Sequence, residues 1–292
     1  MRKPLPVLVD CDPALFTIGL DVDDGLALLF LLGSPEVALL GVTTTAGNTL
    51  GSLAFRDAKK LLALAGRSDI PVTEGAGYPL RPRPTAASRF LTEAVRQLPG
   101  EITLLALGPL TNLAAAAEED RFFERNIGRL VIMGGRSVSG ESDFNFRCDS
   151  RAAERVLKLA TPKTLIPFDL GFGVAITRED VRALLPSKNG LSSILGRRLS
   201  RFARFQDLFR GIRGRAPSEV TGGFHPWDVI AAAWLVAPAL FGDVRPLHPF
   251  VDAKGRTRFD APDGTLEVLM PGTLDAGGFR ELFFERLGRA CS

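Results

Sequence analysis

The chain has 292 residues, of which 46% are hydrophobic, and its 36 basic and 33 acidic side chains leave a net charge of 36 − 33 = +3. So balanced a charge does not favour nucleic acid or an anionic membrane as the main partner, and a small molecule is the better expectation. The three cysteines Cys11, Cys148 and Cys291 are odd in number and widely separated, which indicates neither a disulfide framework nor a zinc site.

The first residues carry neither the apolar run nor the small-residue cleavage site of a secretory signal. The most apolar stretch, Leu26 to Leu32, is far shorter than the roughly 20 residues that a membrane-spanning helix needs. We therefore expect a cytoplasmic protein with no membrane partner.

Buried strands alternate with helices along the chain. The helical patterns cover residues 24–32, 50–65, 111–119 and 150–159, and the short aliphatic runs that predict strands are Val7–Asp10, Val37–Thr45, Ile102–Gly108, Leu130–Gly135 and Thr164–Asp169. This alternation predicts one α/β domain over residues 1–292, with an open, mainly parallel, Rossmann-like sheet and helices on both faces. Ligands bind such sheets beyond the carboxyl ends of the strands.

The first predicted strand leads into a cluster of carboxylates, formed by Asp10, Asp12, Asp21, Asp23 and Asp24. Five like charges at one strand end repel each other unless a cation or shared protons neutralise them. An isolated Asp-Asp pair would be typical of a helix N-terminus. Two acidic clusters on one loop instead favour a metal site, and their oxygen ligands are typical of calcium or magnesium rather than zinc.

Polar residues also follow the later strands. Asn48 follows the second strand, Thr111 opens the helix after Gly108 and Pro109, and Asp143 and Asn145 precede the helix near Ser150. Each segment by itself is typical of a turn, a helix cap or a polar loop. Together they supply the amide and carboxylate groups that hold a polyhydroxylated ligand such as a sugar.

The remaining elements need only structural roles. Residues 78–85 form a predicted loop with three prolines and two arginines, and residues 197–210 form a predicted amphipathic helix that packs Phe202, Phe205 and Phe209. Asp228, taken by itself, is typical of the N-cap of the apolar helix that follows it. A hairpin around Ala253–Gly255 and a closing helix over residues 278–287 complete the chain.

Taken in order, the motifs between Val7 and about residue 235 resemble the inosine-uridine-preferring nucleoside hydrolase family. Each motif is weak by itself, whereas the ordered set is specific. The matching stretches are Val9–Pro13, Asp23–Leu28, Thr43–Asn48, Leu107–Ala114, Met133–Gly135, Asp143–Asn145 and Trp227–Asp228.

This resemblance implies an enzyme that cleaves the N-glycosidic bond of ribonucleosides to ribose and free base. It implies a calcium ion bound by Asp12, Asp24, Asp228 and the backbone carbonyl of Thr111, with Asp10 as a supporting carboxylate. Asp12 would be the general base that takes a proton from a calcium-bound water.

The resemblance also implies how the substrate and the subunits are arranged. The implied contacts to the ribonucleoside come from Asp23, Asn48, Asp143, Asn145 and Trp227. The family further implies a homodimer or homotetramer.

The chain departs from the family pattern in three places. Well-known members have a histidine directly before the last metal-binding aspartate, whereas this chain has Trp227. A tryptophan at this position favours stacking on a purine base. Since Trp227 cannot act as an acid, His225 is a candidate substitute acid. Residues 13–22 form an extended insert that must fold back if Asp12 and Asp24 are to share one ion. The stretch from Gly135 to Asp143, which bears on the base pocket, is shortened.

Two other functions are considered. Haloacid-dehalogenase-like phosphatases also begin with a strand and Asp-x-Asp, but two residues after the second aspartate they have threonine or valine, whereas this chain has Ala14. A non-catalytic ribonucleoside or ribose binder would account for the missing histidine, although a binder needs no base such as Asp12 beside a metal-bound water.

Overall fold

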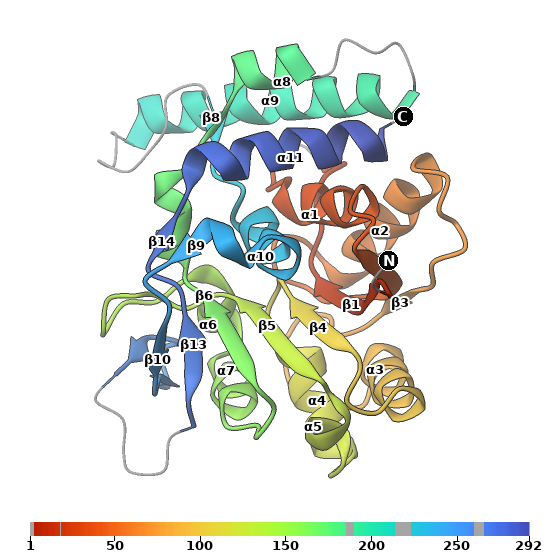
Figure 1. Ribbon diagram of the computed structural model, residues 1–292, viewed down its shortest axis with the longest axis vertical. Coiled ribbons are helices and arrows are strands. Elements are labelled where there is room, and N and C mark those ends of the chain that lie inside the picture. Colours follow the sequence, from red (N-terminus) through yellow and green to blue (C-terminus); the bar gives the residue numbers. More distant parts are fainter. Residues whose placement is uncertain (1–2, 18, 185–189, 214–222, 260–265, 292) are drawn as a thin grey trace.

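The computed structural model describes residues 3–17, 19–184, 190–213, 223–259 and 266–291. An eight-stranded sheet forms its centre (Figure 1). Across the sheet the strands are β10 (Arg245–Leu247), β13 (Val268–Met270), β6 (Lys163–Ile166), β5 (Arg129–Met133), β4 (Thr103–Ala106), β1 (Leu5–Cys11), β2 (Val37–Thr44) and β3 (Val72–Glu74). All neighbours pair in parallel except β10, which is antiparallel to β13, so the predicted mainly parallel sheet is confirmed.

Two hydrophobic cores lie on opposite faces of this sheet, because side chains alternate along each strand. In β1, Val7 and Val9 face one core and Leu8 faces the other. The helices of the first face are α1 (Asp23–Leu32), α2 (Gly51–Leu64), α9 (Gly190–Arg213), α10 (Trp227–Val236) and α11 (Ala276–Ala290). Those of the second are α3 (Ala86–Gln97), α4 (Thr111–Glu119), α5 (Phe123–Asn126) and α7 (Ser150–Leu157), as Figure 1 shows.

The five predicted strands and the helices that follow them are present, with shifted ends. The last predicted strand stops at Ile166 because Pro167 cannot donate to the ladder, and a 3₁₀ helix, η1 (Phe168–Gly173), follows. The shorter elements are α6 (Phe144–Cys148), β7 (Ile176–Thr177), α8 (Arg178–Leu184), β8 (Gly223–Phe224), η2 (Pro238–Leu240), β9 (Phe241–Gly242), β11 (Phe250–Val251), β12 (Thr257–Arg258) and β14 (Thr273–Leu274).

The insert over residues 13–22 folds back against two helices. The backbone N–H of Phe16 donates to Asp57 of α2 at 2.9 Å, and Arg198 of α9 donates to the Phe16 carbonyl. Gly19 has φ = +81° and approaches the ring of Phe205 so closely that a Cβ there would lie 2.8 Å from the ring. The insert therefore returns the chain to α1, beside the end of β1.

The structure also tests the other sequence predictions. The predicted helix over 197–210 lies within α9 and buries Phe202; the side chain of Phe209 lies outside the described residues. Strands β11 and β12 form the predicted hairpin, and α11 is the closing helix. Asp228 is not the N-cap of α10, since Pro226 occupies that position and Asp228 lies in the first turn. Among the described helices, none is long and apolar enough to cross a bilayer.

Candidate active site

A cavity of about 220 Å³ opens at the carboxyl ends of the central strands. Six of the predicted site residues line it, namely Asp23, Asn48, Asp143, Asn145, Trp227 and Asp228. The other lining residues are Asp21, Leu107, Met133, Phe144 and Phe168. The cavity thus lies where ligands bind in open α/β sheets, and it joins segments more than 200 residues apart in the sequence.

Three buried carboxylates meet at this cavity. Asp23 and Asp24 come from the first turn of α1 and Asp228 from the first turn of α10, and one oxygen of each lies within 4.8 Å of the others. Helices α1 and α10 pack against each other, which brings their N-termini together. The backbone N–H of Asp228 donates to Asp23 at 3.2 Å, so the two chain segments are also joined directly.

Asp12 lies beside these three aspartates. Its backbone N–H donates to Asp24 Oδ1 at 3.0 Å, and its own Oδ2 accepts from the backbone N–H of Asn48. The Asn48 side chain donates to Asp24 Oδ2 at 3.1 Å. A Cβ at Gly47 would lie 2.0 Å from Asp12 Oδ2, so only glycine fits there. The long insert therefore does not separate the two acidic clusters, although Asp12 is not one of the three aspartates whose oxygens lie within 4.8 Å of one another.

Burial makes the ionised forms of these carboxylates costly. It raises the pKa of Asp24 to about 6, and it raises the pKa of Asp12, Asp23 and Asp228 well above the usual range of an aspartate. The charges of the neighbouring aspartates add to the effect of burial on the pKa of Asp12, Asp23 and Asp228. The cluster consequently needs either bound protons or a cation to be stable near neutral pH.

A hard divalent cation fits this cluster. Its ligand atoms are carboxylate oxygens, which calcium and magnesium prefer, and no salt bridge to a lysine or arginine among the described residues neutralises them. A cation would also stabilise the ionised forms that burial disfavours. The residues that could hold it are Asp23, Asp24 and Asp228, with Asp12 adjacent.

Asp10 lies below the site and ties three elements together. Its Oδ1 accepts hydrogen bonds from Thr43 of β2 and from Asn112 of α4, at 2.5 and 2.8 Å. Asn112 also donates to the carbonyl of Thr44 and accepts from the backbone N–H of Ala76. Burial raises the pKa of Asp10 to about 7. Asn112 was not predicted as a site residue, although it stands in the motif Gly108–Asn112.

Thr111 is held by a residue that the sequence did not single out. Its hydroxyl donates to Asp149 Oδ2 at 2.7 Å, while Asp149 Oδ1 accepts from the backbone N–H of Ala152 and caps α7. Thr111 is fully buried at the first position of α4 and does not line the cavity. Asp149 therefore fixes the start of α4 relative to α7.

Asp143 and Asn145 shape the opposite wall. Asp143 Oδ1 accepts from the backbone N–H groups of Asn145 and Phe146 and caps α6, and its Oδ2 accepts from Gly135 at 2.7 Å. Asn145 donates from its side-chain amide to the carbonyls of Leu107 and Met133. These bonds assign the Asn145 amide nitrogen away from the cavity, so its carbonyl oxygen is the atom that can accept from a ligand hydroxyl.

Two aromatic rings form the apolar wall. Trp227 stacks on Phe168 with ring centroids 4.5 Å apart and an interplanar angle of 15°, and its Nε1–H donates to the Phe168 carbonyl at 3.1 Å. Behind Phe168 lies the guanidinium of Arg136, which forms an ion pair with Asp169 at 2.7 Å. A Cβ at Gly171 would lie 2.2 Å from the indole, so glycine permits this position of Trp227.

His225 is packed behind this wall. It is 4% exposed, and its Nδ1 lies 2.9 Å from the carbonyl of Gly171 and 2.6 Å from that of Val174. Contact with two acceptors requires a proton on Nδ1. His225 is not among the residues that line the cavity, and these bonds give it a structural role; its predicted role as an acid stays a prediction. Asp21, in contrast, lines the cavity, although the sequence predicted only that it belongs to the insert.

Comparison with known proteins identifies similar chains. Residues 7–266 match the family model described as "Inosine-uridine preferring nucleoside hydrolase". "Probable uridine nucleosidase 2" of Arabidopsis thaliana is 31% identical over 256 residues, which cover 75% of this chain and 77% of the relative. The "Pyrimidine-specific ribonucleoside hydrolase RihA" of Photobacterium profundum is 27% identical, over 97% of this chain and 98% of the relative.

Solved structures are similar over almost the whole chain. "Plant nucleoside hydrolase - PpNRh1 enzyme" superposes with a TM-score of 0.84 at 28% identity, covering 98% of this chain and 99% of that one. The "Purine-Preferring Ribonucleoside Hydrolase from Gardnerella vaginalis" has the same TM-score at 22% identity, over 98% of this chain and 99% of its own, which shows a shared fold.

Proposed function

The chain belongs to the inosine-uridine preferring nucleoside hydrolase family, and we propose that its buried aspartates cleave ribonucleosides with Asp12 as the general base. The chain is an enzyme of N-glycosidic bond hydrolysis, as its hydrolase and nucleosidase relatives indicate. Water adds its oxygen to C1′ of the ribose, the bond from C1′ to the base nitrogen breaks, and ribose and free base are released.

One observation carries the assignment of the catalytic centre. Asp23, Asp24 and Asp228, from two segments about 200 residues apart in the sequence, bring carboxylate oxygens together at a cavity whose other walls are apolar, amide and carboxylate side chains. Burying three like charges is unfavourable unless a ligand or cation uses them. Asp12 is hydrogen-bonded to Asp24 and Asn48, so its carboxylate is oriented at the edge of the same cluster.

As the family resemblance implies, we propose Asp12, Asp24, Asp228 and the Thr111 carbonyl as the ligands of the cation and calcium as the ion. The meeting of Asp24 with Asp228 supports this set, and hard oxygen ligands suit calcium or magnesium. Asp10 supports the set by fixing β1 against β2 and α4. When bound, the ion would neutralise the carboxylates and make water more acidic. Asp12 would accept the proton of the attacking water, because burial raises the pKa of its carboxylate well above the usual range of an aspartate and so makes it a stronger base.

The sugar is held by the polar wall of the cavity. Asp23 and Asn48 lie on the side of the aspartate cluster and would accept and donate to the ribose 2′- and 3′-hydroxyls. Asp143 and the carbonyl oxygen of Asn145 would reach the 3′- and 5′-hydroxyl side. Such contacts hold C1′ in line with the water and so lower the entropic part of the barrier.

The base would lie against the aromatic wall of Trp227 and Phe168. A purine offers more ring area to this wall than a pyrimidine, which supports a preference for purine ribonucleosides. The indole N–H of Trp227 is too weak an acid to protonate the leaving base and already donates to the Phe168 carbonyl, so protonation would come from solvent or, as the sequence predicted, from His225. The names of the curated relatives refer to uridine and pyrimidines, and base preference is therefore the feature to measure.

Two further features belong to the proposal. We expect a homodimer or homotetramer, which light scattering after gel filtration would measure. We also expect a cytoplasmic enzyme, since the three cysteines occur without a disulfide in the described residues.

The test is base release from inosine, guanosine, adenosine, uridine and cytidine, with and without a chelator. We expect hydrolysis that is lost with the chelator and restored by calcium. Asp12→Asn should abolish turnover while ribose binding stays measurable by calorimetry, because the amide keeps the shape but cannot take the proton. No release of base from any of the five nucleosides would refute the proposed function.

The alternatives from the sequence are not favoured. The family match and the hydrolase relatives do not favour a non-catalytic ribonucleoside or ribose binder, nor a haloacid-dehalogenase-like phosphatase.

A further inference from the structure

The described residues also line a second, larger cavity. It measures about 650 Å³ and lies between the loop that contains Leu80 and Pro82 and the junction of α6 with α7. We call this cavity the arginine groove, because Arg81, Arg147 and Arg151 all line it.

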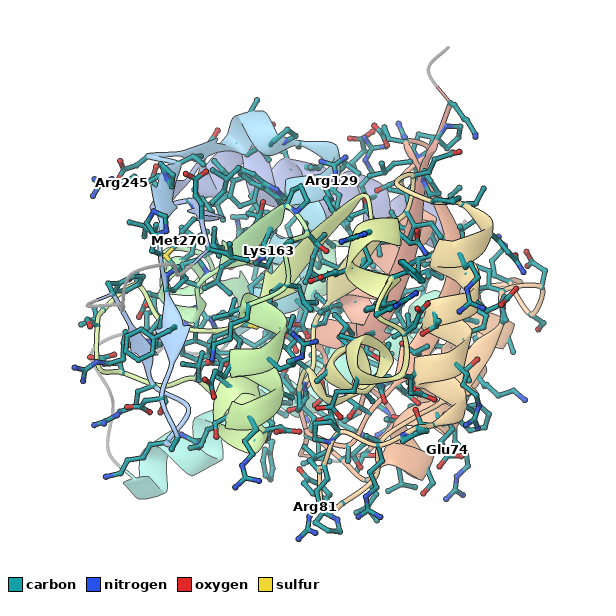
Figure 2. The ribbon with its side chains drawn as sticks, turned by 90° about the horizontal axis from the view of Figure 1, so that it is seen from below. Glu74, Arg81, Arg129, Lys163, Arg245 and Met270 are labelled. Atoms are coloured by element: carbon teal, nitrogen blue, oxygen red, sulfur yellow. The ribbon has the colours of Figure 1, made fainter. Side chains whose placement is uncertain are left out.

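The three guanidinium groups of the groove are exposed and uncompensated. Within the part of the chain that the structure describes, Arg81, Arg147 and Arg151 form no salt bridge and no side-chain hydrogen bond. Figure 2 shows the side chain of Arg81 at the outer edge of the molecule, on the same side as Glu74, the last residue of β3. Arg129 and Lys163, the first residues of β5 and β6, lie toward the opposite side. The groove therefore lies at the carboxyl edge of the sheet, as the active site does.

The single acidic residue of the groove, Asp149, offsets only part of these charges. Asp149 has both oxygens engaged, one with the Thr111 hydroxyl and the other with the backbone N–H of Ala152. Ser150 donates to the carbonyl of Ala253. Arginines elsewhere on the described surface, such as Arg67, Arg245 and Arg280, pair with an acidic side chain. The three guanidinium groups around the groove do not, so the groove concentrates positive charge.

The groove and the active site share helix α6, and one hydrogen bond joins the loop of the groove to a loop of the active site. Helix α6 turns Phe144 and Asn145 to the ribose cavity and Arg147 and Cys148 to the groove. The loop on the other side is joined to the active site through Tyr78, whose hydroxyl donates to the carbonyl of Gly47 at 2.9 Å, one residue before Asn48.

The charges of the two cavities also act on each other. Burial raises the pKa of Cys148, which lines the groove, to about 11, and the charge of Asp12 contributes to this rise, whereas Arg147 opposes it. The residues assigned to the 5′ side of the sugar, Asp143 and Asn145, stand at the start of α6, and Arg147 and Cys148 of the same helix line the groove.

We propose that the arginine groove binds a phosphate group, and that this phosphate is the 5′-phosphate of a ribonucleotide whose ribose occupies the active site. Arginine suits this ligand because its planar guanidinium forms paired hydrogen bonds with phosphate oxygens. The inference rests on the proposed function, and it extends the substrates from ribonucleosides to ribonucleoside 5′-monophosphates.

The reaction with such a substrate is the same hydrolysis. The oxygen of water bonds to C1′, the bond from C1′ to the base nitrogen breaks, one proton of the water goes to Asp12 and a proton is delivered to the base. The products are ribose 5-phosphate and free base, and no further reactant is consumed.

The experiment measures kcat/KM for a nucleoside and its 5′-monophosphate with the full chain in calcium. We expect the monophosphate to be hydrolysed, with inorganic phosphate as a competitor. Replacing Arg81, Arg147 and Arg151 together by alanine should lower kcat/KM for the monophosphate at least 10-fold and change that for the nucleoside less than 2-fold. Arg89→Ala, which removes another exposed arginine on α3, should change neither.

Three results would overturn the proposal. The first is that the monophosphate neither reacts nor competes with the nucleoside. The second is that kcat/KM for the monophosphate is the same in the triple variant as in the unchanged protein. The third is that inorganic phosphate binds but the monophosphate does not. Nucleoside hydrolysis in the same samples separates this failure from a failure of the proposed function. The single variants Arg147→Ala and Arg151→Ala, read by circular dichroism and by nucleoside turnover, show whether the groove variants fold.

Discussion

The hydrogen bond between Thr111 and Asp149 should be a large contributor to the stability of the candidate site. In Thr111→Val the side chain keeps its shape but no longer donates to the buried Asp149 Oδ2, which lies 2.7 Å from the hydroxyl. A hydrogen bond to a charged acceptor contributes about 1.5–3 kcal/mol, and the acceptor would be left without that donor. We therefore expect the variant to lose about 2 kcal/mol of unfolding free energy.

The expected change can be converted to a melting temperature. The entropy of unfolding is about 2.1 cal/mol/K per residue. For a chain of this length, a loss of about 2 kcal/mol in unfolding free energy therefore lowers the melting temperature by roughly 3 °C. The measurement is urea and thermal unfolding of the calcium-free protein, followed by calcium titration, in which the variant should bind calcium more weakly because the start of α4 is no longer fixed.

Two matched variants serve as controls for this prediction. Thr111→Ser keeps the hydroxyl and should recover most of the stability. Thr92→Val removes a buried hydroxyl that has no hydrogen-bond partner in the described structure, so it should cost nothing or stabilise the protein. The reasoning is refuted if Thr111→Val and Thr92→Val have the same unfolding free energy.

The other predictions concern the aromatic wall and the effect of pH. Trp227→Ala should lower the purine-to-pyrimidine ratio of kcat/KM several-fold, and an unchanged ratio contradicts purine stacking. Gly171→Ala should lower kcat/KM at least 10-fold because its Cβ would lie 2.2 Å from the indole, whereas Gly173→Ala, with no atom within 4 Å, should have little effect. In chelator, the melting temperature should fall as the pH rises from 4 to 7: the folded-state pKa values of Asp10 and Asp24 are about 7 and 6, so the folded state binds more protons than the unfolded state in this range. Calcium should reduce this fall, and a flat profile in chelator contradicts the assigned burial.

The fold could largely be predicted because its central strands are buried on both faces. Continuous aliphatic runs such as Ile102–Gly108 are therefore interpreted as buried strands of a parallel sheet. Strands β3 and β13 have three residues each, too few to show a period, and were not predicted. The end of β6 was placed too late because apolar residues continue into η1, although Pro167 already interrupts the ladder.

The candidate site could be predicted where the chemistry is local. The acidic clusters and the polar strand ends were visible as residue types at strand ends, and six of the predicted site residues line the cavity. Partners that meet only through the fold were not visible: Asn112 binds Asp10 from 102 residues away, and Asp149 binds Thr111 from 38 residues away. Sequence spacing carries no information about such pairs.

The distance along the chain between Asp24 and Asp228 has a consequence during synthesis. These two aspartates meet in the folded protein but are separated by 228 − 24 = 204 residues. At the roughly 5–20 residues per second of a ribosome, the first aspartates wait about 10–40 s for the last one. During that time the emerging chain holds an incomplete set of ligands, and a cation can complete the centre only after Asp228, which lies in the final third of the chain, has left the ribosome.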